Sequence, residues 1–266
     1  MIKETRLCTW LEVNDKMPTS YSNFKTIDVD EISNNCSEDI LYYISDLFGT
    51  HIFRKEFLKE INDILKWEKV QEYIDISSIL PTQSNIKKGD FGEILFSSIL
   101  EEFHDYIIPV TKIQYKIIPN QSLPRTDILA LRIKDNLINE VCYVESKLRT
   151  TNDTYAAVEA HDQLKEDYNT KMPEILIFVL RILSYKNSPL LPKFKIYMQD
   201  RKDNKNYDTF RISLCWEKSK WSDTVLKNLD DNGVKLSKLH VHVIKINNLS
   251  NLVDKIYGLL EARLKK

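Results

Sequence analysis

Two neighbouring stretches decide the fold of this chain: Asp127-Ile-Leu-Ala-Leu-Arg-Ile133 and Glu140-Val-Cys-Tyr-Val-Glu-Ser-Lys147. Both are short and rich in apolar residues, which is typical of strands. Between them, Lys134-Asp135-Asn136 has turn chemistry, because Asp and Asn tolerate left-handed backbone conformations. The pattern predicts an antiparallel hairpin, in which the start of the first strand and the end of the second meet at one edge of a sheet.

Three charged side chains gather at that edge of the predicted hairpin. Asp127 begins the first strand, and Glu145 and Lys147 end the second. Since strand side chains alternate between faces, Glu145 and Lys147 point the same way and Ser146 points the opposite way. Asp127, Glu145 and the backbone carbonyl of Ser146 then offer convergent oxygen ligands, which suit a hard cation such as Mg²⁺ or Mn²⁺. The hairpin therefore predicts a divalent-metal site.

These groups fit the hydrolysis of a phosphodiester bond. A bound divalent cation activates water and neutralises the phosphate, and Lys147 can orient that water or hold the phosphate. The alternative is an exposed cross-strand ion pair without a chemical role, because Glu-x-Lys triplets often occur by chance. The apolar strand before the triplet and the second carboxylate, Asp127, favour a catalytic site.

A glycine-containing segment, Lys88-Gly-Asp-Phe-Gly-Glu93, precedes both strands and opens a predicted helix. The chain has only 5 glycines, so two of them here mark a special backbone position. Asp90 and Glu93 fit a capping box, with Asp90 at the N-cap and Glu93 at the third helical position. A glutamate in the first turn of a helix can also face a nearby metal, so Glu93 is a candidate for both roles.

Basic and amide side chains near the predicted site are candidates for contacts with DNA phosphates. Some lead into the first strand, one follows the Glu-Ser-Lys triplet, and one lies on the next predicted helix. They are Lys112, Lys116, Arg125, Arg149 and Gln163. The alternative for the helical residue is a solvated surface position.

Other polar residues carry weaker signals. Tyr168 and His161 lie on the same predicted helix as Gln163 and could touch DNA or water. His240 and His242 share a strand face, but no third ligand is near them in the sequence, so they do not predict a metal site.

The remaining pattern predicts an N-terminal section at 1–85, a possible partner-docking region, and a nuclease-like domain at 86–266. The polar segment 80–85, which contains a proline, is the expected linker. We expect helices at 37–48, 52–67, 89–103, 154–168 and 249–266, and strands at 8–13, 106–118, 127–133, 140–147, 194–199, 210–216 and 239–246. Segment 174–183 is apolar and fits either a strand or a helix. Helix, three strands and helix around the site predict an α/β (α+β) fold, with a mixed central sheet flanked by helices.

Composition limits the classes of function. The chain has 266 residues and a net charge of −1, so it has no overall basic surface for nucleic acid, and any phosphate-binding surface must be local. We therefore expect weak DNA binding by the chain alone and delivery by a partner. A Walker-type phosphate loop is absent from the sequence, so the chain is not itself an ATP-driven motor.

The cysteines and the N-terminus suggest a compartment. Cys8, Cys36, Cys142 and Cys215 are scattered, which does not support a zinc ribbon or a redox pair. The first residues lack the apolar region of a signal peptide, and no apolar stretch is long enough to span a bilayer. We expect a cytoplasmic protein with no membrane association.

At Lys88 to Glu93, Arg125-Thr126-Asp127 and Tyr143 to Lys147, the sequence resembles the nuclease-subunit family (HamA) of the bacterial Hachiman anti-phage system. The resemblance covers about residues 86–170 best. It implies a PD-(D/E)xK restriction-endonuclease-like core. The acidic pair and lysine of the family correspond to Asp127, Glu145 and Lys147, and its helix glutamate corresponds to Glu93. One departure is Thr126, which stands where the family motif has proline.

The resemblance also implies a biological role. Members of the family work with a superfamily 2 helicase (HamB-like), which restrains the nuclease until it meets phage or damaged DNA. On this basis we expect a Mg²⁺-dependent deoxyribonuclease that acts in antiviral defence. Two alternatives stay open: a restriction or repair endonuclease that acts alone, and a non-catalytic module that regulates a helicase.

Overall fold

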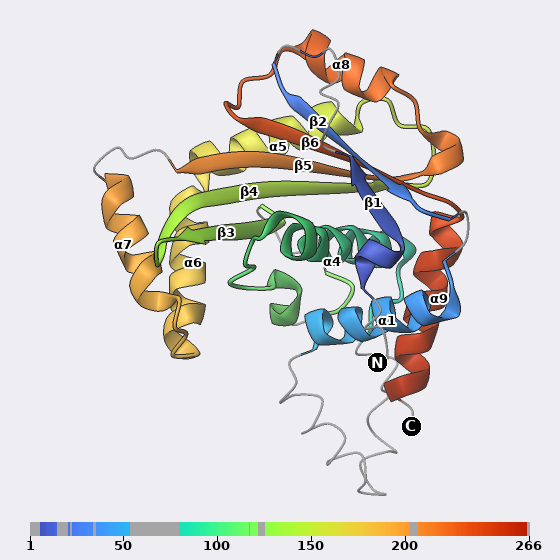
Figure 1. The fold of residues 1–266 in the computed structure, drawn as a ribbon, viewed down its shortest axis with the longest axis horizontal. Helices are drawn as coiled ribbons and strands as arrows, with labels where there is room; N and C mark the ends of the chain where they lie inside the picture. Colours follow the sequence, from blue (N-terminus) through green and yellow to red (C-terminus); the bar gives the residue numbers. More distant parts are fainter. Residues whose placement is uncertain are drawn as a thin grey trace, which may run out of the picture.

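The computed structural model describes residues 6–14, 21, 23–33, 36–53, 80–116, 118–121, 126–202 and 207–264. Its centre is a six-stranded sheet in the order β1-β2-β6-β5-β4-β3 (Figure 1). The strands are β1 (Leu11–Asn14), β2 (Lys25–Glu31), β3 (Ile128–Lys134), β4 (Leu137–Arg149), β5 (Asp208–Glu217) and β6 (Leu239–Ile246).

The sheet is mixed. β2, β6, β5 and β4 are parallel to their neighbours, whereas β1 pairs with β2 and β3 pairs with β4 in antiparallel fashion. The predicted fold class, a mixed sheet flanked by helices, is confirmed. Strands from both sides of the predicted 85/86 boundary belong to this one sheet; the boundary itself stays a prediction.

Helices cover both faces of the sheet, as Figure 1 shows. One face carries α1 (Glu38–Ile52), α4 (Ser84–His104) and α9 (Leu249–Leu264), and the other carries α5 (Ala156–Thr170), α6 (Met172–Tyr185), α7 (Leu191–Lys202) and α8 (Thr224–Asn232). β4 is buried on both sides: Cys142 and Val144 belong to the core beneath α4, and Val141 and Tyr143 belong to the core beneath α5. Short 3₁₀ turns occur at Leu7–Thr9, Lys112–Tyr115 and Lys218–Lys220.

Several local predictions are confirmed. Asp135 and Asn136 form the hairpin turn with φ of 50° and 65°, the left-handed values expected for a tight turn. The helix predicted at 37–48 matches α1, and Ser37 caps it by accepting a hydrogen bond from the backbone N–H of Ile40. The strand predicted at 239–246 matches β6, and segment 174–183, which fitted either state, is the helix α6.

Two predicted strands are wrong. Residues 194–199 lie in α7, where Phe194 and Tyr197 are buried one turn apart. The alternation of apolar and charged residues in this short segment also fits a strand, which explains the wrong prediction. The described residues of 106–118 include an isolated bridge at Ile107 and a 3₁₀ turn at Lys112–Tyr115, and they form no strand. Pro109 lies between them and has no N–H for a ladder hydrogen bond.

Other boundaries moved. In the strand predicted at 8–13, residues 7–9 are a 3₁₀ turn and β1 begins at Leu11. Of the helix predicted at 52–67, residues 54–67 lie outside the described part. Sequence reasoning missed β2 and α8. None of the described helices combines the length and apolar character that crossing a bilayer requires.

Candidate active site

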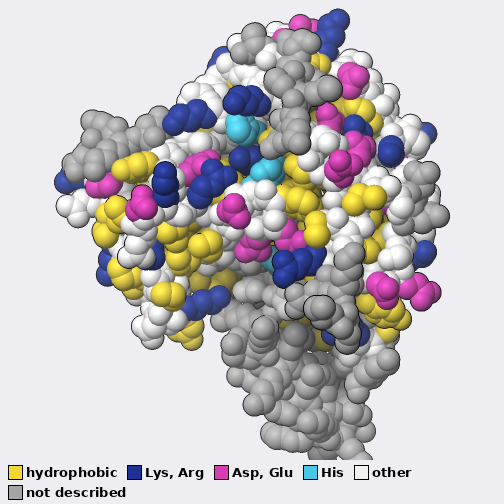
Figure 2. Space-filling view, in the orientation of Figure 1, with side chains coloured by type: hydrophobic (Ala, Val, Ile, Leu, Met, Phe, Trp, Pro, Cys, Tyr) yellow, Lys and Arg dark blue, Asp and Glu magenta, His cyan; other side chains and the backbone are white. Residues whose placement is uncertain are grey.

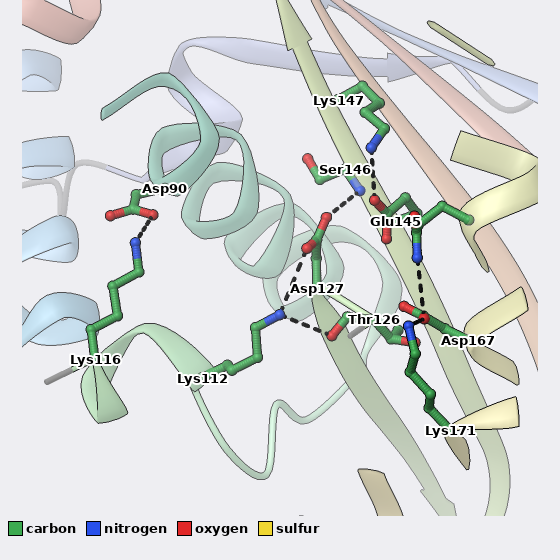
Figure 3. Close-up of polar contacts among 11 residues, drawn as sticks. Asp90, Lys112, Lys116, Thr126, Asp127, Glu145, Ser146, Lys147, Asp167 and Lys171 are labelled. Atoms are coloured by element: carbon green, nitrogen blue, oxygen red, sulfur yellow. Dashed lines mark hydrogen bonds and ion pairs between the residues drawn. The ribbon is translucent and has the colours of Figure 1, made fainter. Parts of the chain in front are cut away.

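The two ends of the β3–β4 hairpin meet, as its sequence predicts. Ile128 pairs with Val144, and the backbone N–H of Asp127 donates to the Val144 carbonyl at 3.1 Å. The side chain of Asp127 turns back to β4, where its Oδ2 accepts a hydrogen bond from the backbone N–H of Ser146 at 2.9 Å (Figure 3). Asp127 is thereby fixed beside the Glu-Ser-Lys triplet.

Glu145 and Lys147 project from one face of β4 and pair with each other. Lys147 Nζ lies 2.9 Å from Glu145 Oε1. Glu145 is only 5% exposed, and its Oε2 is enclosed without a hydrogen-bond partner among the described residues. An enclosed carboxylate oxygen without a donor is costly, so this oxygen is suited to a ligand.

Ser146 contributes its backbone to the same edge of the sheet. The N–H and C=O groups of one strand residue point to the same side, so the Ser146 carbonyl is directed past the start of β3, as its N–H is. The side chain of Ser146 points to the opposite face, toward α4. A Cβ built on Gly92 would lie 3.1 Å from Ser146 Oγ. Gly92 therefore allows α4 to approach β4 closely at the site.

The predicted capping box is wrong. α4 begins at Ser84, so Asp90 lies inside the helix and is not its N-cap. Asp90 is 4% exposed and forms an ion pair with Lys116, whose Nζ lies 2.5 Å from Asp90 Oδ1. The predicted linker is shortened by the same change, because Ser84 and Asn85 are helical. Glu93 consequently lies in the third turn of α4, and a role in the first helical turn does not apply to it.

Glu93 nevertheless faces the hairpin. Glu93, Asp127 and Lys112 line one small cavity. Lys112 Nζ lies 3.7 Å from Asp127 Oδ1 and donates to the backbone carbonyl of Thr126 at 3.2 Å. The cavity thus brings a carboxylate of α4 and one lysine next to Asp127.

The site crowds carboxylates where little water reaches them. Burial raises the pKa of Glu93 well above its ordinary value, and the neighbouring charge of Asp127 adds to this. Burial and the charge of Asp127 also raise the pKa of Glu145 to about 8, although Lys147 acts in the opposite direction. Burial raises the pKa of Asp127 as well, against the effect of Lys112. The lysines do not fully balance the acids, and a further cation would favour their ionised forms.

The residues fit a hard cation in chemistry. Asp127, Glu145 and the Ser146 carbonyl are oxygen donors at one edge of the sheet, and the enclosed Glu145 Oε2 is free to bind. Within the described ranges, however, no three His, Cys, Asp or Glu side chains are close enough together to hold a metal by themselves. A cation here would therefore need the backbone carbonyl, water or substrate oxygens to complete its ligands, as Mg²⁺ sites commonly do.

Helix α5 and its C-terminal cap contribute two residues that sequence reasoning missed, Asp167 and Lys171, next to the predicted Gln163. Gln163 Nε2 donates to Asp167 Oδ1 at 3.1 Å, and Lys171 Nζ lies 2.8 Å from the same oxygen. Asp167 is fully buried, and its charge is among the influences that raise the pKa of Asp127. The spacing of four residues places all three on one line of the helix, a signal that the sequence carried.

The other residues predicted on α5 have structural partners. His161 is fully buried, and its Nε2 accepts a hydrogen bond from the backbone N–H of Lys235 at 3.1 Å. Tyr168 donates to Asp208 at 2.6 Å. These contacts hold α5 against the rest of the protein.

Of the basic candidates, Arg149 is half-buried near the end of β4 and pairs with Asp153 at 2.6 Å and Glu159 at 3.1 Å. Lys112 lies at Asp127, and Lys116 is engaged with Asp90. Arg125 lies outside the described residues. Contacts of these side chains with DNA stay predictions.

The histidine pair on β6 belongs to a buried polar network on the face of the sheet that α4 covers, where the His242 ring packs against Phe96. The Arg211 guanidinium donates to His242 Nε2 at 2.6 Å and to the hydroxyl of Tyr106 at 3.3 Å. Tyr106 in turn donates to Glu140. Burial lowers the pKa of His240 to about 4 and that of His242 well below its ordinary value, so both rings are neutral at pH 7.

Comparison with known proteins bears on the family of this chain. The profile of the HamA family matches residues 4–260, a range that includes every strand of the sheet and every candidate site residue. The chain is also similar to the Hachiman protein HamA of Bacillus cereus, with 26% identity over 165 residues. That alignment covers 61% of this chain and 58% of the relative, somewhat over half of each. Since the family profile extends from before β1 into α9, the chain belongs to the HamA family.

Proposed function

We propose that this chain is a Mg²⁺-dependent deoxyribonuclease of the PD-(D/E)xK type that hydrolyses phosphodiester bonds, with Mn²⁺ as a possible substitute. One observation carries the proposal: the end of the β3–β4 hairpin places Asp127 beside Glu145, which pairs with Lys147 at 2.9 Å. The raised pKa of both carboxylates supports it, because a site built for a cation holds acids close together.

Each residue has a role in this proposal. Asp127, Glu145 and the Ser146 carbonyl hold the cation. When bound, Mg²⁺ lowers the pKa of a coordinated water and neutralises charge on the phosphate. Lys147 orients the attacking water and stabilises the phosphate oxygens. Glu93, in the cavity next to Asp127, adds a carboxylate that can accept a proton.

For the biological role, we propose that the chain acts in the cytoplasm as the effector of an anti-phage defence complex, together with a superfamily 2 helicase. Similarity to the Hachiman protein HamA of Bacillus cereus supports this role. A net charge of −1 supports delivery to DNA by a partner. In the part of the surface shown in Figure 2, acidic and basic side chains of the described residues are interspersed, which does not favour strong DNA binding by this face.

The test is DNA cleavage by the full chain in complex with its helicase partner, with Mg²⁺ and with EDTA. We expect cleavage to require Mg²⁺ and to fall about 100-fold or more in Glu145→Ala and in Lys147→Ala. The matched control is Glu166→Ala, which removes an exposed glutamate of α5. Circular dichroism and melting temperature show whether each variant folds.

Three outcomes would change the assignment. Undiminished cleavage in a folded Glu145→Ala, Lys147→Ala double variant would show that the chemistry lies elsewhere. Cleavage by the chain alone, with a preference for a DNA sequence or structure, would favour a stand-alone restriction or repair endonuclease. Retained protection against phage in the Glu145→Ala variant would favour a non-catalytic regulator of the helicase.

A further inference from the structure

A line of three polar residues on α5 borders the candidate site from the side opposite α4. Gln163, Asp167 and Lys171 follow one another at intervals of four residues, which places them on one face of the helix and its C-terminal cap. Both outer residues contact the same atom of the middle one, Asp167 Oδ1: Gln163 Nε2 at 3.1 Å and Lys171 Nζ at 2.8 Å. The three side chains therefore form one connected unit.

Asp167 is the buried centre of this unit. It is 0% exposed, and its Oδ2 is enclosed without a hydrogen-bond partner among the described residues. A buried carboxylate is costly unless donors satisfy it. The amide of Gln163 and the ammonium of Lys171 supply two donors, so Asp167 fixes where both of these groups lie.

The unit faces the candidate site and not a remote surface. The negative charge of Asp167 reaches Asp127, whose pKa it helps to raise. In Figure 3, Asp167 and Lys171 lie on the side of Glu145 opposite Lys147, and Lys112 lies across Asp127. Lys147 pairs with Glu145, Lys112 lies 3.7 Å from Asp127, and Lys171 pairs with Asp167, so lysines from three elements border the candidate site.

We propose that Lys171 and Gln163 bind the phosphate backbone of DNA on the α5 side of the site, and that Asp167 is the positioning residue that holds them. The proposal rests on the proposed nuclease function and specifies which side chains bind its DNA substrate. Lysine ammonium groups bind phosphates as point charges, and side-chain amides donate hydrogen bonds to phosphate oxygens. The side chain of Lys171 is 35% exposed, so its ammonium can be reached by substrate while Asp167 orients it.

The rival explanation is an ion pair of the common i, i+4 kind, which stabilises the end of α5 and touches no substrate. The two explanations differ in sign for Asp167→Asn. Removing a negative charge near DNA strengthens phosphate binding if charge alone matters. If Asp167 positions two phosphate contacts, the same change weakens binding because both contacts lose their anchor.

The experiment measures binding of a fluorescently labelled DNA duplex to the full chain by anisotropy. Ca²⁺ replaces Mg²⁺ to prevent cleavage, and the salt concentration is varied from a low starting value. We expect Lys171→Met to weaken binding about 5-fold or more and to reduce the slope of log affinity against log salt by about one. Asp167→Asn should also weaken binding. Lys171→Arg should retain most of the affinity and the slope.

Lys165→Met is the matched control, because Lys165 lies two residues from Gln163, on the far side of the same helix. It should leave affinity and slope unchanged. Melting temperatures accompany every variant. If Asp167→Asn does not fold, Lys171→Met and Gln163→Leu decide the question, because neither changes a fully buried side chain.

Equal or tighter binding by folded Asp167→Asn would overturn the positioning role, and an unchanged slope in Lys171→Met would overturn the phosphate contact. Failure to bind DNA at low salt by the unaltered chain would overturn both. Failure of the proposed function is recognised separately, because it appears as a lack of Mg²⁺-dependent cleavage by the unaltered complex while the binding differences persist.

Discussion

The surroundings of Glu145 strongly change the pKa of its carboxyl group. This residue is nearly fully buried, it lies next to Asp127, and its hydrogen-bond partner among the described residues is Lys147. Burial and Asp127 together outweigh the lysine and raise the pKa of Glu145 from about 4.5 to about 8. Without a cation, the ionised form of this carboxylate therefore works against folding.

A pH dependence of stability follows for Glu145→Gln. Below pH 4.5 the carboxyl is protonated in both the folded and the unfolded state. Between pH 4.5 and 8 the unfolded state ionises first, so stability of the unaltered chain is lost as pH rises, and above pH 8 the loss is complete. The glutamine variant lacks this loss. We expect its free energy of unfolding, relative to the unaltered chain, to rise by on the order of 2–4 kcal/mol between pH 5 and pH 9.

Urea unfolding in EDTA at several pH values measures this difference. A stability difference that does not change between pH 5 and pH 9 would contradict the raised pKa of Glu145.

At the scale of elements, the contact between α4 and β4 sets the distance from Glu93 to the hairpin. Gly92 makes this contact, since a Cβ there would lie 3.1 Å from Ser146 Oγ and 3.5 Å from Leu148 Cβ. On the same helix, Gly89 has no neighbour within 4 Å of such a Cβ. The two glycines therefore offer a matched comparison.

We expect Gly89→Ala to stabilise the protein by about 0.5–1 kcal/mol, because alanine favours a helix more than glycine does. Gly92→Ala should gain less, or lose stability, and should slow cleavage, since α4 must shift by a few tenths of an ångström. Adding Ser146→Ala to Gly92→Ala removes the crowding oxygen and should recover part of both losses. Thermal unfolding and cleavage rates measure these effects; equal gains for both glycine variants would show that the contact is not tight.

The elements also show how far sequence reasoning reaches. The hairpin and the positions of Asp127, Glu145 and Lys147 could be predicted, because strand alternation and a two-residue turn are local properties. The start of α4 could not, because the burial of Asp90 depends on Lys116, which comes from another part of the chain. Asp167 was missed for a related reason: burial on a helix face depends on what packs against it, although the spacing from Gln163 to Lys171 is visible.

Tertiary pairing limited the prediction of strands as well. β2 has its apolar residues placed between acidic ones, and its partners β1 and β6 lie far apart in sequence. In α7, the buried pair Phe194 and Tyr197 fits a helix, but its short run of alternating residues fits a strand equally well. Local pattern alone does not separate these cases.

At the scale of the whole molecule, the polar network around Tyr106 ties the end of α4 to β4, β5 and β6. Tyr106 is 3% exposed; it donates to Glu140 and accepts from Arg211, which also donates to His242. Tyr106→Phe leaves these buried groups short of one partner. We expect it to lower the free energy of unfolding by about 1–3 kcal/mol and to leave the metal dependence of cleavage unchanged.

Chemical unfolding and a Mg²⁺ titration of cleavage check this expectation. Tyr185→Phe is the control, because Tyr185 is 79% exposed and should tolerate the change. A large change in the Mg²⁺ requirement of Tyr106→Phe would mean that the network and the candidate site are coupled.

The pairing of β2 with β6 has a consequence for the order in which the protein can be completed. Lys245 on β6 and Asp28 on β2 form an ion pair at 3.0 Å across 217 residues of sequence. A ribosome releases the N-terminal strands first. β2 joins the sheet through β6, so β1 and β2 cannot pair with the sheet until β6 has been made. The β3–β4 hairpin and α4, which packs on β4 and β3, are made earlier, whereas α9 cannot pack on the sheet until residues 249–264 have been made. Translation products that stop before β6 would carry every candidate site residue on an unfinished sheet, so the candidate site can be complete only after β6 has been made.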